Sequence, residues 1–172
     1  MDAAKANSKN IILNYGAILG ATSILISLTQ YVLGQHLSPN MIYGLLSIVI
    51  MILITFLAIR NFKATNDGFL SFGEAVKIGV GVAVISAVIA IIYNQLFMTF
   101  IEPDFMDQLI AKQEEDLFNK GLNEEQIEAT MNMTNKMKGP FISSAIGIVA
   151  SAFIGFIISA ITGAIMKQSK EA

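Results

Sequence analysis

The residues that could carry chemistry in this 172-residue chain are few, and their types and spacing argue against a catalytic centre. His36 is the only histidine, and it stands in a short turn with no carboxylate close to it in the sequence. A single imidazole is a poor ligand set for a metal ion. We therefore interpret His36 as a solvated loop histidine, with pH sensing or metal binding as the alternative. The chain has no cysteine, which excludes disulfides, thiolate metal sites and cysteine nucleophiles.

Methionines and carboxylates gather between residues 102 and 138. Three thioethers in this region could hold Cu(I), but in a helix the side chains of Met131 and Met133 would point about 200° apart. We interpret these methionines, with Met137, as core or interface residues. The carboxylates form two groups, Glu114, Glu115 and Asp116, then Glu124, Glu125 and Glu128. We interpret them as a solvated acidic face, and predict no catalytic, cofactor-binding or metal-binding residue.

Long uncharged segments set the fold class. No Asp, Glu, Lys or Arg occurs between Lys9 and Arg60, between Lys77 and Glu102, or between Lys138 and Lys167. The composition is 54% hydrophobic and 14% charged, with a mean hydropathy of +0.63. A bilayer requires about 20 apolar residues for each helical span. The sequence thus predicts an all-α polytopic membrane protein, a single domain over residues 1–172, with four transmembrane helices at about 11–33, 39–59, 76–101 and 139–166.

The start of the third span carries a clear helix signal. Ser71 and Glu74 have the spacing of a capping box, in which the hydroxyl and the carboxylate satisfy backbone N–H groups. We expect Gly73 to let a neighbouring helix approach, and Lys77 to reach the membrane interface with its ammonium group. These four residues are structural candidates at the membrane surface.

Two other capping signals organise the loops. Ser38 followed by Pro39 predicts the start of the second helix, with Ser38 as its N-cap. Asn123 and Gln126 form a second capping signature within residues 102–138. We therefore expect this segment to be a helical extracytoplasmic hairpin between the third and fourth spans.

The distribution of basic residues predicts the orientation. Cytoplasmic loops carry an excess of Lys and Arg. Four lysines lie in the segment 102–138, whereas seven basic residues fall on the other side, namely Lys5, Lys9, Arg60, Lys63, Lys77, Lys167 and Lys170. We expect a multi-pass protein of the bacterial inner membrane with both termini in the cytoplasm, and we interpret the first span as a retained signal anchor.

The fourth span contains a regular row of small residues. They recur at every fourth position, as Gly139, Ser143, Gly147, Ser151, Gly155, Ser159 and Gly163. Small residues at this spacing let two helix backbones approach closely in lipid. We predict that Gly147, Ser151, Gly155 and Ser159 pack against another helix, either within the bundle or across a homodimer.

The segment Gly68 to Gly79, with the sequence Gly-Phe-Leu-Ser-Phe-Gly-Glu-Ala-Val-Lys-Ile-Gly, resembles the signature of a family of small bacterial four-span proteins, a domain of unknown function. The resemblance continues at the Pro-Asp-Phe-Met segment 103–106, and at Gly121 followed by residues 124–127. It implies an inner-membrane protein with no assigned catalytic residue.

Apart from Lys77 at the edge of the third span, the four spans contain no Asp, Glu, Lys or Arg. This pattern limits the functional hypotheses, because ion and proton pathways usually place ionisable residues within the bilayer. We favour a structural or accessory interaction subunit that contacts the lipid bilayer and a membrane-protein partner or a second copy of itself. We expect no nucleic-acid partner, no cofactor and no enzymatic activity. The alternative is a transporter of small solutes or lipids without intramembrane charge. A second open hypothesis is a cytoplasmic docking surface formed by Phe69, Leu70 and Phe72.

Overall fold

The computed structural model describes residues 7–38, 40–137 and 139–168. The described chain is all-helical, which confirms the predicted class. Four of its helices are long and apolar enough to span a membrane, namely α1, α2, α3 and α6. The elements in chain order are α1 (Ser8–Val32), α2 (Met41–Thr65), α3 (Phe72–Phe100), α4 (Phe105–Asn119), α5 (Glu124–Met137) and α6 (Pro140–Met166).

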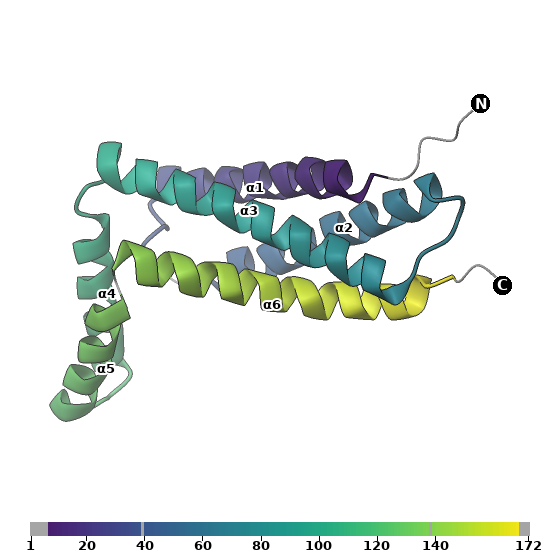
Figure 1. Ribbon diagram of the computed structural model, residues 1–172. Helices are drawn as coiled ribbons and strands as arrows, with labels where there is room; N and C mark the ends of the chain where they lie inside the picture. Colours follow the sequence, from purple (N-terminus) through teal and green to yellow (C-terminus); the bar gives the residue numbers. More distant parts are fainter. Residues whose placement is uncertain (1–6, 39, 138, 169–172) are drawn as a thin grey trace.

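The four long helices form a bundle with α3 at its centre. Helix α3 packs against α1, α2 and α6, and Figure 1 shows these helices side by side. The first turn of α1 and the last turn of α6 lie at one end of the bundle, which we call the termini end, together with the loop between α2 and α3. Helices α4 and α5 form a hairpin that stands off the opposite end, which we call the hairpin end. The hairpin therefore projects away from the bundle that holds it.

Two helix starts have the local structure that the sequence predicts. At α3, the Ser71 hydroxyl accepts a hydrogen bond from the Glu74 backbone N–H at 3.2 Å, and the Glu74 carboxylate accepts one from the Ser71 N–H at 2.8 Å. At α5, the Gln126 N–H donates to the Asn123 side chain at 2.9 Å, and the Asn123 N–H donates back to the Gln126 side chain at 3.2 Å. Both pairs satisfy backbone donors that a helix start leaves open.

The predicted cap of α2 is wrong. The N-cap is Asn40, whose side-chain oxygen accepts from the Ile42 N–H at 2.9 Å, while Ser38 lies in the preceding turn. Pro39 lies outside the described residues. Asparagine caps a helix as well as serine does, and Asn40 directly precedes the apolar run. Helix α2 also continues to Thr65, beyond the predicted span, so its last turns carry basic side chains at the termini end.

The loop between α2 and α3 is fastened to the end of α6. Leu70 is fully buried, and its backbone exchanges hydrogen bonds of 3.0 and 2.9 Å with the backbone of Gln168. The Lys63 ammonium donates to the Met166 carbonyl at 3.0 Å. The docking surface that the sequence left open at Phe69, Leu70 and Phe72 therefore lacks Leu70, which is enclosed in the protein.

Candidate functional site

The surface residues predicted at the start of α3 do not form a binding site with one another. Ser71 and Glu74 are occupied in the capping box, and Lys77 is exposed. At Gly73 an added Cβ would meet no neighbouring atom within 4 Å, so none of the described helices makes the close approach that we expected there. All four residues lie at the termini end, where Ser71 and Glu74 cap the start of the central helix.

Small residues bring α3 and α6 into close contact in the half of the bundle near the termini. A Cβ added at Gly155 would lie 2.6 Å from the Ala83 Cβ and 3.1 Å from the Gly79 carbonyl oxygen. Ser159 is fully buried against Gly79, and its hydroxyl donates to the Gly155 carbonyl at 2.6 Å. A Cβ added at Gly163 would lie 2.7 Å from the Ala75 Cβ. The two backbones can approach here because neither helix carries a large side chain between them.

The close contact of this row with α3 does not continue to Gly147 among the described residues. No described atom lies within 4 Å of a Cβ added at Gly147, and Ser151 is only partly buried. Both residues line a groove at the hairpin end of the α3–α6 pair. Of the four residues that we predicted to pack, Gly155 and Ser159 meet α3 directly, whereas Gly147 meets no helix of this chain. A homodimer contact at Gly147 stays a prediction.

Sequence reasoning missed the glycines that join α1 to α3. A Cβ added at Gly16 would lie 2.6 Å from the Ile85 Cβ, and one added at Gly20 would lie 2.9 Å from the Ile89 Cβ. Both glycines are buried. Their spacing of four positions in an apolar helix is the usual signal of close helix packing, and it could have identified this contact.

These contacts predict opposite responses at two glycines of α6. Gly155→Leu forces a branched side chain against Ala83 and should lower the free energy of unfolding by about 3 kcal/mol, as overpacking does. Gly147→Leu, which enters open space, should leave unfolding of the single chain nearly unchanged. The measurement is thermal or denaturant unfolding in detergent.

Ile154→Leu is the control, because it conserves volume at an exposed position beside Gly155. Equal stability of Gly155→Leu and Ile154→Leu would contradict the α3–α6 packing described above.

The environment of His36 corrects the interpretation made from the sequence. Its Nε2 lies 3.2 Å from one carboxylate oxygen of Glu102 and 3.0 Å from the other. The exposed fractions of the two side chains are only 17% and 15%. His36 is therefore a half-buried partner of a carboxylate and not a solvated loop histidine. The sequence could not show this, because the two residues are separated by 66 positions.

Aromatic rings surround the His36–Glu102 contact. The Tyr31 ring meets the His36 ring edge-on at 5.1 Å, and the Phe105 ring stacks on His36 at 6.0 Å. Phe97 is in edge contact with both Tyr31 and Phe105. The second nitrogen of His36, Nδ1, is buried and has no hydrogen-bond partner among the described residues. The cluster ties the α1–α2 turn to the junction between α3 and α4, and so positions the hairpin.

We expect the His36–Glu102 contact to stabilise the hairpin end measurably. Glu102→Gln and His36→Phe should each lower the free energy of unfolding, with a coupling of about 1 kcal/mol between them in a double-mutant cycle. Phenylalanine retains ring contacts with Tyr31 and Phe105 but cannot donate a hydrogen bond. Detergent unfolding curves of the four proteins provide the coupling energy.

The matched control is Lys112→Gln, which removes a surface ion pair of the same hairpin and should not change the unfolding midpoint. Strictly additive effects of Glu102→Gln and His36→Phe would show that the contact contributes nothing.

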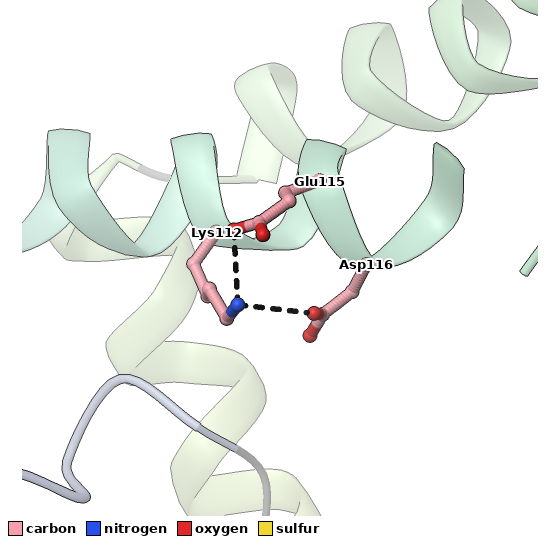
Figure 2. A network of polar contacts seen from close by, with 3 residues as sticks. All are labelled: Lys112, Glu115 and Asp116. Atoms are coloured by element: carbon pink, nitrogen blue, oxygen red, sulfur yellow. Dashed lines mark hydrogen bonds and ion pairs between the residues drawn. The ribbon is translucent and has the colours of Figure 1, made fainter. Parts of the chain in front are cut away.

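The hairpin itself carries a network of charges on its surface. Figure 2 shows that the Lys112 ammonium lies between two carboxylates of the same helix, at 2.9 Å from Glu115 and 3.6 Å from Asp116. The hydrogen bond and the negative charge of Glu115, followed by the charge of Asp116, raise the pKa of Lys112 above its ordinary range. This arrangement supports the helix α4 through side chains three and four positions apart.

The methionines of the hairpin diverge as expected. Met131 is buried against the α4–α5 interior, whereas Met133 is 65% exposed. Helices α4 and α5 are also joined by a hydrogen bond of 3.3 Å from the Gln113 amide to the Thr134 hydroxyl. Among the described residues, no group of three or more His, Cys, Asp or Glu side chains is arranged to hold a metal ion.

A groove lies between three helices near the hairpin end of the bundle. It has a volume of about 530 Å³ and lies between α3 and α6 at the hairpin end, with Phe105, Met106 and Leu109 of α4 across it. Its lining includes Asn94 and Gln95 of α3. A pocket of this size is in the range that small molecules and lipids occupy.

The fold and this geometry define a class, a helical bundle with four helices that could span a membrane and a hairpin outside them. The chain belongs to the family described as protein of unknown function DUF4199, whose model matches residues 14–168. Neither a curated protein nor a solved structure matches the chain.

Proposed function

We propose that this protein is a structural or accessory interaction subunit of the bacterial inner membrane, and that its α4–α5 hairpin is the part presented to a partner. The observation that supports this proposal is the separation of roles between the bundle and the hairpin. The bundle is closely packed around α3, whereas the hairpin has its own small core at Ile127 and Met131 and projects from the bundle (Figure 1).

The surface of the hairpin supports an interaction role more than a catalytic one. Phe118 is 71% exposed, and carboxylates of Glu114, Glu124 and Glu128 line a shallow groove beside it. Exposed aromatic side chains are enriched in protein interfaces, and charges around them favour partners of opposite sign. The proposed partner is a membrane protein, or a second copy of this chain, that contacts the hairpin outside the bilayer.

The proposed orientation puts both termini in the cytoplasm and the hairpin on the opposite side. Because the chain has no cysteine, single replacements give an unambiguous readout. Gln35→Cys and Glu114→Cys should react with an impermeant thiol reagent in intact spheroplasts, while Thr65→Cys should react only after lysis. Labelling of Thr65→Cys from outside would reject this orientation.

The interaction role predicts a stoichiometric complex that depends on the hairpin. After crosslinking in native membranes, the tagged full chain should purify with one further chain in fixed ratio. Phe118→Ser should reduce that yield at least several-fold, because it removes exposed aromatic area from the interface. The measurement is quantitative mass spectrometry of the purified complex.

Lys120→Ala is the control for this experiment, since Lys120 is an exposed residue of the same hairpin turn. A chain that purifies alone as a monomer, or a complex that Phe118→Ser leaves intact, would contradict the proposed role of the hairpin.

A further inference from the structure

The groove at the hairpin end carries an inference that goes beyond an accessory role. Five polar side chains line it. Ser143 donates its hydroxyl to the Gly139 carbonyl of its own helix at 3.0 Å, and the other four are Asn94 and Gln95 on α3 and Ser144 and Ser151 on α6. None of the four makes a side-chain hydrogen bond with a described residue. Two amides and two hydroxyls without partners therefore gather around one cavity.

Unpartnered polar groups are costly beside a membrane. Hydrocarbon offers no hydrogen bonds, so an amide within a span normally finds a partner on another helix. In this chain α3 and α6 have separated at that level, and Gly147 has no described atom within 4 Å of an added Cβ. Asn94 and Gln95 are exposed at the groove, so a molecule that enters it can reach both amides and supply hydrogen-bond partners.

The remaining lining residues limit the chemistry of that molecule. None of the fourteen described residues that line the groove carries a charge, and its walls include Ile91, Met98 and Met106. A charged head would lose its hydration here without gaining a counter-charge. An uncharged head that can donate and accept hydrogen bonds, joined to a hydrocarbon chain, matches both parts of the lining.

We propose that the groove binds an uncharged membrane amphiphile, with a hydroxyl-bearing head at Asn94 and Gln95 and a hydrocarbon chain along the apolar wall. A transmembrane helix from a second copy fits less well. Helix α4 lies across the hairpin end of the groove through Phe105 and Leu109, so a helix that followed α6 would meet α4. The flexible hydrocarbon chain of an amphiphile can end within the groove and does not meet α4.

Tryptophan fluorescence provides the test, because the native chain has no tryptophan. Met98→Trp places a reporter in the groove, and Leu45→Trp places one on the exposed face of α2. Each protein is reconstituted in phosphatidylcholine vesicles that contain increasing amounts of dibrominated monooleoylglycerol, which quenches nearby tryptophan. Met98→Trp should reach half-maximal quenching at a mole fraction about tenfold lower than Leu45→Trp does, as expected for one or two hydrogen bonds in the membrane.

Blocking variants separate occupancy of the groove from general contact with lipid. Gly147→Phe fills the groove from open space and should remove the tenfold preference of the Met98→Trp reporter. Gly44→Phe makes the same replacement at an exposed site of α2 where an added Cβ also meets nothing within 4 Å, and should preserve the preference. The double variant Asn94→Leu and Gln95→Leu removes both amides without blocking the groove, and should also abolish the preference.

Head chemistry is tested with dibrominated oleic acid at a pH where it is ionised, which should show no preference for Met98→Trp. Three results would overturn the proposal. These are equal quenching of both reporters, a preference that survives both Gly147→Phe and the double amide variant, and crosslinked dimers that Gly147→Phe converts to monomers without any effect on quenching. The last result would assign the groove to a second copy of the chain. The readout does not depend on a partner protein, so failure here and failure of the accessory role are distinguishable.

Discussion

Close contact between backbones along α3 is the constraint on which the rest of the structure depends. Helices in lipid gain little from burying apolar surface against one another, so packing and close approach must hold them together. Glycines supply that approach on both sides of α3, at Gly16 against Ile85 and at Gly155 against Ala83. Because both contacts lie on the central helix, α3 fixes the positions of both α1 and α6. The loops then connect helices whose positions these contacts have set.

The groove is a geometric consequence of the same contacts. A row of residues spaced by four advances about 40° around a helix at each step, so a straight neighbour can follow it for only part of its length. On α6 the row meets α3 at Gly163, Ser159 and Gly155, and by Gly147 it meets no described atom within 4 Å. The helices separate there, and α4 lies across the opening. The tight packing near the termini end and the groove near the hairpin end thus have the same cause, which is the way α3 and α6 cross.

The fold could be predicted from the sequence further than the site could. Uncharged runs, the Ser71–Glu74 capping box and the small residues of α6 are local patterns, and local geometry determines what they do. The His36–Glu102 contact joins residues 66 positions apart, and the sequence around either residue does not indicate the other as its partner. The N-cap of α2 is Asn40 and not Ser38. Serine and asparagine cap helices about equally well, so residue type alone could not choose between the two positions. The groove depends on where two helices separate, which a repeat in one helix cannot reveal.

Phe105 connects the two features at the hairpin end. Its ring stacks on His36, which is held by Glu102, and the same side chain lines the groove between α3 and α6. Anything that moves α4, including a partner on the hairpin, therefore moves a wall of the groove. The reverse also holds, because a ligand that stabilises one position of Phe105 stabilises the corresponding position of the hairpin. Any coupling between the two proposed binding events is reciprocal by thermodynamic necessity, so each would change the binding free energy of the other by the same amount.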